Sequence, residues 1–444
     1  MKFRIVAWPE LPPVTSTTFS ALFAFALLAS VVVRMWLARR QIRFVAAHRD
    51  AVPAAFAERI GIGAHRKAAD YTVAKQRLSM LHTLTDALLL LAMTLGGGLA
   101  AIVAWTETIA VGPLWRDVLM FAIAGAVYGL VNLPFSWWHT FRIEERFGFN
   151  RMTPALWLAD LAKGLAVAMV LGLPLLVLVL WLMRVAGALW WLWAWGAWMV
   201  FQLLVLVLYP TLIAPLFNKF TPMGESPARQ RVEALLARCG FTSAGLFVMD
   251  GSKRSGHGNA YFTGFGRAKR IVFFDTLLAR LAPDEIEAVL AHELGHYKLK
   301  HVTKRVLWSA ALSLAILALL AWMARAPWFY TGLGIPAPML SIAMARPGVA
   351  LELFLLALPV FTFMLEPLSA MYSRRHEFEA DAFATRHASA VSLTLALVKL
   401  YEDNAATLTP DPLHSAFYDS HPPAAVRIAH IEALAGPEPL ALAA

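Results

Sequence analysis

The chain has 444 residues, of which 59% are hydrophobic and only 15% are charged. A mean hydropathy of +0.60 together with 16 tryptophans excludes an ordinary soluble globular protein and is typical of a multi-span membrane protein. The formal net charge of +10 falls largely on loops beside the hydrophobic segments, so we expect no nucleic-acid partner.

Seven apolar windows are long enough to cross a bilayer as helices, which takes about 20 residues each. They lie at residues 17–37, 84–105, 118–138, 162–182, 190–212, 306–326 and 349–372. These windows divide the chain into an N-terminal membrane region at 1–216, a first hydrophilic region at 217–304, a second membrane region at 305–372 and a second hydrophilic region at 373–444. The first window continues past Ala29 and Ser30 into three valines, so we expect a retained anchor and not a cleaved signal peptide.

Basic residues predict the orientation of the chain. Nine Lys and Arg lie in residues 39–77, whereas the loop 106–113 has none. The positive-inside rule places the first of these loops in the cytoplasm. Alternation then puts the N-terminus outside and both hydrophilic regions inside, where they can form one domain. The alanine-rich composition and compact loops favour a bacterial inner-membrane protein; a eukaryotic chain of this kind would lie in the endoplasmic reticulum.

The first hydrophilic region predicts a small α/β unit. We expect a helix at 227–239, a strand at 245–249, and strands at 259–265 and 270–274 joined by a turn. A further helix begins at Pro283, because acidic residues follow this proline in the first turn. The single cysteine, Cys239, cannot form an internal disulfide and is expected to pack against its neighbours.

A His-Glu-x-x-His motif lies on the helix that begins at Pro283. His292 and His296 are four residues apart and therefore project from the same helical face, a spacing that suits one metal ion. Imidazole nitrogens ligate Zn²⁺, and Glu293 beside the first ligand can act on water as a general base. The motif predicts a zinc hydrolase.

A catalytic zinc site usually has three protein ligands, so the third is expected from the second hydrophilic region. In that region Glu377 and Asp381 form another i, i+4 pair on one helical face. We assign Glu377 to zinc and Asp381 to a hydrogen bond that orients a ligating imidazole. Glu379 points about 200° away from Glu377, so both cannot face one metal.

Three histidines are weaker candidates for the third ligand. His301 lies too near the end of the zinc helix to return easily to the metal. His376 and His387 lack a carboxylate at a matching spacing, and we expect both at the surface.

Together, residues 292–296 and 373–381 resemble the CAAX prenyl protease 1 family, the integral-membrane a-factor-converting endopeptidases. Further segments carry the resemblance, namely Glu-Glu-Arg-Phe-Gly-Phe-Asn at 144–150, the segment 209–222 around Tyr-Pro and Ala-Pro-Leu-Phe-Asn, Asn-Ala-Tyr-Phe at 259–262 and Ser-His-Pro-Pro at 420–423. The resemblance covers about residues 140–435.

The resemblance implies a mostly α fold. Seven transmembrane helices would form a chamber, with a cytoplasmic-side gluzincin-type zinc metalloprotease domain that contains a small β-sheet. It implies one Zn²⁺ per chain, held by His292, His296 and Glu377, with Glu293 as the base. A substrate peptide would lie as an extended strand along Asn259, Ala260, Tyr261 and Phe262. His421 and Arg427 match positions that steady the oxyanion.

We therefore predict a zinc metalloendopeptidase embedded in the lipid bilayer. The family's task is to remove the three residues that follow a prenylated cysteine. General turnover of membrane proteins or peptides without prenylation is the alternative, because a zinc site and an edge strand bind backbone more than side chains. A transporter or a pseudoenzyme is disfavoured, since transport has no use for a general base beside two zinc ligands.

Overall fold

The structure is a computed structural model that describes residues 14–263 and 270–436. Its helices are α1 (Ser16–Ala47), α2 (Ile62–Met93), α3 (Gly98–Glu107), α4 (Pro113–Trp138), α5 (Pro154–Val185), α6 (Trp190–Leu208), α7 (Ala214–Phe217), α8 (Pro227–Arg238), α9 (Asp275–Leu278), α10 (Pro283–Lys298), α11 (His301–Met323), α12 (Pro327–Gly332), α13 (Leu340–Ala345), α14 (Pro347–Thr362), α15 (Glu366–His387), α16 (Ala390–Asp403), α17 (Pro412–Tyr418) and α18 (Ala424–Ala435). Its strands are β1 (Phe220–Pro222), β2 (Leu246–Met249), β3 (Ala260–Thr263) and β4 (Arg270–Phe274).

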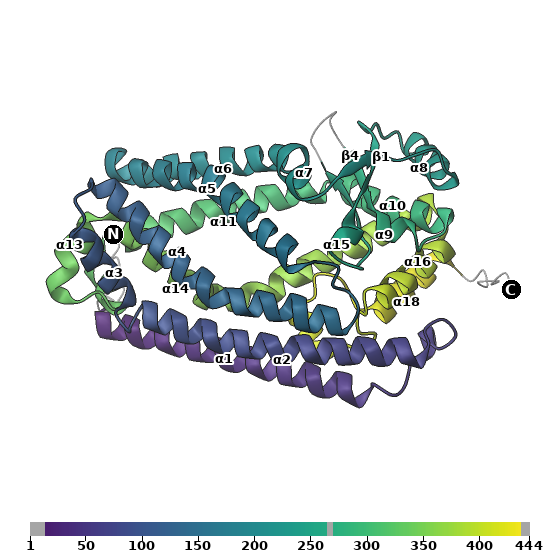
Figure 1. The fold of residues 1–444 in the computed structure, drawn as a ribbon, viewed down its shortest axis with the longest axis horizontal. Helices are drawn as coiled ribbons and strands as arrows, with labels where there is room; N and C mark the ends of the chain where they lie inside the picture. The colour runs from purple at the N-terminus through teal and green to yellow at the C-terminus, as the bar shows by residue number, and fades with distance from the viewer. Residues whose placement is uncertain (1–13, 264–269, 437–444) are drawn as a thin grey trace, which may run out of the picture.

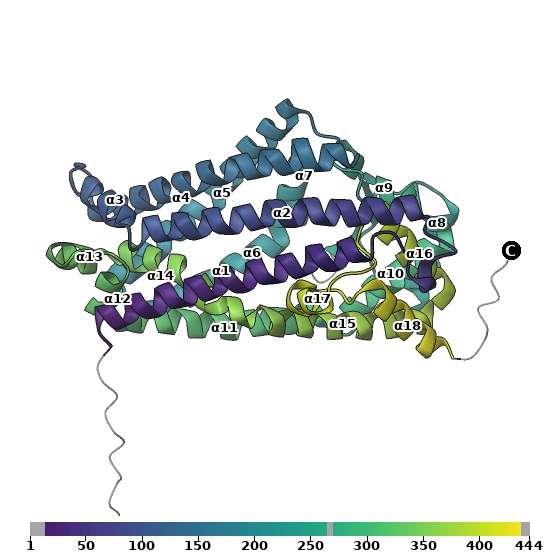
Figure 2. The same ribbon diagram turned by 90° about the horizontal axis from the view of Figure 1, so that it is seen from below.

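Long apolar helices run along the molecule, and the sheet with the shorter helices α8, α9, α10, α16 and α18 lies at one end (Figures 1 and 2). Within the described residues, six helical segments are long and apolar enough to cross a membrane, or seven if the bent pair of α2 and α3 forms one span. The expected fold class, mostly α with membrane helices and a small β-sheet, is confirmed.

The second apolar window, expected as one helix over 84–105, is broken between α2 and α3 by a bend of 47°. The sequence Gly96-Gly97-Gly98 explains the break. Gly97 adopts a positive φ of 76°, and a Cβ at Gly96 or at Gly98 would lie 2.8 Å from the Ala92 carbonyl oxygen. Side chains larger than hydrogen cannot occupy this turn, so the glycines allow α3 to leave the axis of α2.

A buried charge cluster ties the membrane helices together at the end remote from the sheet. The Asp117 carboxylate of α4 is fully buried and accepts hydrogen bonds from Arg346 at 2.8 Å and from Arg184 of α5 at 2.5 Å. The Gly348 N–H of α14 also donates to Asp117, at 3.2 Å, and a Cβ at Gly348 would lie 2.6 Å from that side chain. Paired charges of this kind are tolerated among membrane helices, so the cluster fixes α4, α5 and α14 relative to one another.

The sheet has the strand order β1-β2-β4-β3. The central pair β2 and β4 is parallel, and both outer pairings are antiparallel. Ile271 and Phe273 of β4 are almost fully buried and pack with Leu290 and Leu294 of α10 in one hydrophobic core. This core sets α10 against the sheet and so positions the histidine motif beside β3.

Candidate metal centre

The histidine motif lies on α10. The helix begins at Pro283, where a missing N–H costs no hydrogen bond, and the Glu285 carboxylate accepts a hydrogen bond from the Ala282 N–H at 2.7 Å. The regular helix that follows places His292 and His296 on one face, with ring centroids 4.9 Å apart.

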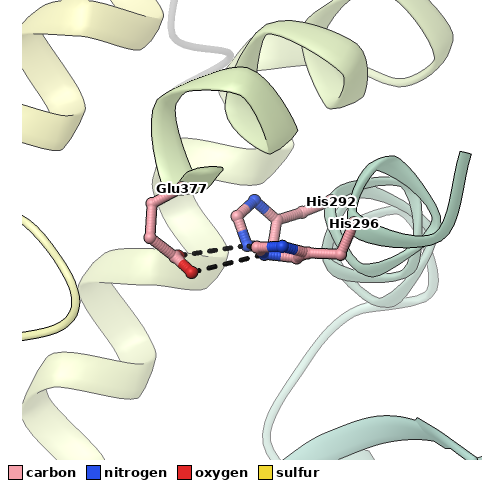
Figure 3. A group of neighbouring side chains, drawn as sticks. All are labelled: His292, His296 and Glu377. Atoms are coloured by element: carbon pink, nitrogen blue, oxygen red, sulfur yellow. Dashed lines mark hydrogen bonds and ion pairs between the residues drawn. The ribbon is translucent and has the colours of Figure 1, made fainter. Parts of the chain in front are cut away.

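A close helix crossing brings Glu377 of α15 to these histidines (Figure 3). Gly295 of α10 faces α15, and a Cβ at this position would lie 3.0 Å from the Ala380 Cα and 3.1 Å from the Phe383 Cβ. Ordinary contacts between carbon atoms are about 3.5–4.0 Å. The absence of a side chain at Gly295 therefore allows the approach of α10 to α15.

Donor atoms of His292, His296 and Glu377 lie at the separations expected of ligands to one ion. The two Nε2 atoms are 3.2 Å apart, and the Glu377 carboxylate oxygens lie 3.4 Å from His292 Nε2 and 3.3 Å from His296 Nε2. Ligands at about 2.0–2.1 Å from a tetrahedral Zn²⁺ are themselves about 3.3–3.4 Å apart. Glu377 Oε2 is buried and has no hydrogen-bond partner among the described residues. The group therefore fits a metal ion with one position left open.

Asp381 and Arg427 lie beside Nδ1 of the His292 ring, away from the Nε2 atom that faces Glu377. His292 Nδ1 lies 2.8 Å from Asp381 Oδ1, so the ring can donate this hydrogen bond while Nε2 remains free for a metal. The Arg427 guanidinium donates two hydrogen bonds to the same carboxylate, at 2.9 and 2.6 Å. Asp381 is fully buried and Arg427 is 5% exposed. This bidentate pair holds Asp381 in place against His292.

His296 is supported by a longer chain of hydrogen bonds. Its Nδ1 lies 2.9 Å from His301 Nδ1, and His301 Nε2 lies 3.0 Å from Glu379 Oε2. If His296 Nε2 binds a metal, its Nδ1 carries the proton, His301 Nδ1 accepts it, and His301 Nε2 donates to Glu379. The tautomer of each ring follows from the one before it, so His301 and Glu379 orient His296 as Asp381 orients His292.

The sequence did not predict that His301 and Glu379 support His296, and the expectation that His376 lies at the surface is wrong. His376, expected at the surface, is 2% exposed and stacks on His301 with ring centroids 4.0 Å apart and an angle of 9° between the planes. Donor atoms of His301, His376 and Glu379 also lie within 4.8 Å of one another. The ring nitrogens of His301 and His376 lie in two parallel planes, so their lone pairs do not point at one ion. We therefore interpret this group as hydrogen-bonded support for His296 and not as a second metal site.

Glu293 and His421 face a cavity of about 600 Å³ that His292, Glu377 and Arg427 also line. Burial raises the pKa of Glu293, which makes its carboxylate a stronger base than an exposed one. His421 Nε2 lies 3.5 Å from Glu377 Oε1, and its side chain is largely exposed at the rim. The cavity therefore presents a base and a hydrogen-bond donor together with the metal group.

The expected substrate-binding residues lie in and beside β3, at the edge of the described sheet. The Phe274 N–H of β4 donates to the Asn259 carbonyl at 3.0 Å. Because inward and outward pairs alternate along an antiparallel strand, Ala260 and Phe262 direct their backbone groups to the open edge. The Asn259 side chain accepts the Ala260 N–H at 2.8 Å. Asn259 and Ala260 line the cavity, and so the open edge begins next to Glu293.

Comparisons with known proteins agree with this architecture. Residues 41–219 match the model of the CAAX prenyl protease N-terminal region with five membrane helices, and residues 225–435 match that of peptidase family M48. The chain is 38% identical over 312 residues to CAAX prenyl protease 1 homolog of Arabidopsis thaliana, covering 68% of this chain and 70% of that protein. It is 35% identical to CAAX prenyl protease 1 of Saccharomyces cerevisiae, covering 71% and 72%. The crystal structure of S. mikatae Ste24p superposes with a TM-score of 0.85 at 29% identity, covering 95% of this chain and all of that one.

Proposed function

Because the chain belongs to peptidase family M48, among the membrane zinc metalloproteases of the CAAX prenyl protease 1 type, we propose that His292, His296 and Glu377 hold its Zn²⁺ and that Glu293 is the catalytic base. The observation that carries this assignment is the set of three donor separations of 3.2, 3.3 and 3.4 Å. Two imidazoles and one carboxylate suit Zn²⁺, and this ligand set with an open fourth position is typical of catalytic zinc.

Hydrolysis then proceeds through the groups in the cavity. Held by His292, His296 and Glu377, a Zn²⁺ ion would supply the Lewis acidity that polarises the scissile carbonyl and lowers the pKa of the attacking water. Glu293 takes the proton of this water and delivers it to the leaving amine. His421, whose Nε2 lies 3.5 Å from Glu377 Oε1, would donate to the developing oxyanion. Arg427 is engaged by Asp381, so its part is to hold that carboxylate and to add positive charge to the site, with His421 as the direct donor.

The substrate is a peptide or protein that lies as an extended strand against β3. The Ala260 carbonyl and both backbone groups of Phe262 would pair with its backbone, as in other cases of strand addition to a sheet edge, while the Ala260 N–H is bound by the Asn259 side chain. The names of the relatives favour a prenylated CAAX substrate. Pairing through the backbone is compatible with many sequences, which keeps general turnover of membrane proteins as the second candidate.

The nine Lys and Arg within residues 39–77 support a cytoplasmic location for the zinc site. The N-terminus would then lie outside and the C-terminal region inside, in the bacterial inner membrane if the source is bacterial. In the bilayer the membrane helices would enclose the chamber that leads to the zinc.

Cleavage of a matched peptide pair in detergent tests this function. One peptide carries a farnesylated cysteine before its last three residues, and the other carries the same cysteine unmodified. We expect Glu293→Gln to retain one zinc but lose hydrolysis, and Glu377→Gln to lose zinc by elemental analysis. Glu402→Gln on the exposed side of α16 is the matched control. Full activity of Glu293→Gln would refute the assignment, and equal rates on both peptides would favour general turnover.

A further inference from the structure

Lys75 of α2 contributes a positive charge to the active-site cavity without a carboxylate partner. Its Nζ lies 4.0 Å from the centre of the Tyr71 ring, and no carboxylate oxygen of a described residue lies within 4.0 Å of it. The same cavity is lined by Glu293 and Glu377. An ammonium group without a carboxylate partner beside membrane helices is costly, and such groups usually serve a function.

The carboxylate whose charge acts on Lys75, that of Glu144, is already engaged by other residues. Glu144, at the end of the π-helical turn His139–Glu144, accepts a hydrogen bond from the Tyr71 hydroxyl. His257 Nε2 lies 3.3 Å from its other oxygen. His257 in turn places Nδ1 3.1 Å from Asn404 Oδ1. Tyr71, His257 and Asn404 are thus bonded to Glu144 or to one another, whereas no described residue accepts a hydrogen bond from the Lys75 ammonium group.

The direction of β3 indicates which part of a peptide substrate would reach Lys75. A peptide that adds to β3 is expected to pair antiparallel, because antiparallel ladders are slightly more stable per residue than parallel ones. Its chain would then run from Phe262 towards Asn259 and on to His257. Those last two residues line the cavity with Lys75. The residues after the scissile bond therefore lie on the Lys75 side.

We propose that Lys75 binds the free α-carboxylate of the peptide substrate and so directs cleavage to a site a few residues from the C-terminus. The proposal rests on the proposed function, because it requires a peptide laid along β3 at the metal centre. An extended residue spans about 3.3–3.6 Å, so only a short C-terminal segment fits a cavity of about 600 Å³. Lys75 would thus select chain ends over internal peptide bonds.

Two peptides of identical sequence, one ending in a carboxylate and one in a carboxamide, test the proposal with the full-length protein in detergent. We expect wild-type kcat/KM to be roughly 10- to 100-fold higher for the acid than for the amide, the effect of one hydrogen-bonded charge pair. Lys75→Gln should lower the rate on the acid to that on the amide and leave the amide rate unchanged. Lys75→Arg should restore part of the preference.

Lys67 supplies the matched control, because it also lies on α2 and places its Nζ 4.4 Å from an aromatic ring but does not line the cavity. Lys67→Gln should keep the wild-type preference for the acid. An equal rate of wild type on both peptides, or a preference that survives in Lys75→Gln, would overturn the proposal.

The same comparison by binding separates this proposal from the proposed function. In the Glu293→Gln protein, the acid should bind more tightly than the amide by a similar factor, and Lys75→Gln should remove the difference without any need for catalysis. Equal binding of both peptides contradicts the role of Lys75. Hydrolysis by Glu293→Gln contradicts the proposed function instead.

Discussion

Replacing Gly295 by alanine should separate α10 from α15 where the proposed metal ligands meet. The added Cβ would lie 3.0 Å from the Ala380 Cα and 3.1 Å from the Phe383 Cβ. Restoring ordinary carbon contacts of about 3.5–4.0 Å requires a movement of roughly 0.5 Å. Glu377 is attached to α15, so its distance from His296 Nε2, now 3.3 Å, would increase by a similar amount.

This movement exceeds the tolerance of about 0.2 Å in metal–ligand distances. We expect zinc affinity to fall about 10- to 100-fold, measured by competition with a chelator, and kcat/KM for a peptide to fall by about 100-fold. Gly164→Ala in α5 is the control, because a Cβ there would meet no atom within 4 Å. Wild-type zinc affinity and kcat/KM in Gly295→Ala would refute the reasoning.

Three further changes test other parts of the account. His301→Phe keeps the ring that stacks on His376 but removes the nitrogen acceptor beside His296 Nδ1, and it should weaken zinc about 10-fold in the same competition; unchanged affinity would show that the contact does not orient the ligand. Burial raises the pKa of Glu293 above its ordinary value of 4.5. Only the ionised base accepts a proton, so kcat/KM should fall as the pH drops through this raised pKa, whereas a limb at or below pH 4.5 would contradict the assignment. Asp117→Ala removes the buried carboxylate that pairs with both Arg184 and Arg346 and leaves Arg346 only Glu107 as a charged partner among the described residues, so it should reduce the free energy of unfolding by about 3 kcal/mol, seen as a lower melting temperature in detergent; an unchanged melting temperature would show that these pairs do not stabilise the fold.

Local periodicity accounts for the parts of the site that could be predicted from the sequence. Residues spaced by four on a helix share a face whatever the rest of the chain does, so His292 and His296 could be paired, and Glu377 could be paired with Asp381. Pro283 and the acidic residues that follow it also predicted where α10 would begin. The meeting of α10 with α15 depends on Gly295, whose role is visible only once both helices are placed.

The positions of His301, His376 and Lys75 could not be predicted, because they depend on contacts between residues that are not related by a regular spacing in the sequence. His301 returns to His296 because Lys300 adopts a positive φ of 59° and turns the chain directly from α10 into α11. His376 is buried by stacking on His301, a contact between two separate helices. Lys75 reaches the cavity from α2, far from the metalloprotease region in the sequence, and a single basic residue among nine gave no signal of this.

The X-ray absorption spectrum of the purified protein at the zinc edge tests the central claim most directly. One zinc per chain should show only nitrogen and oxygen ligands at about 2.0–2.1 Å, with the scattering pattern of two imidazoles. The same spectrum from Glu377→Gln protein should lose intensity as zinc is lost. A sulfur ligand at about 2.3 Å, for which Cys239 is the only cysteine source, or full zinc occupancy in Glu377→Gln, would contradict the assignment of His292, His296 and Glu377.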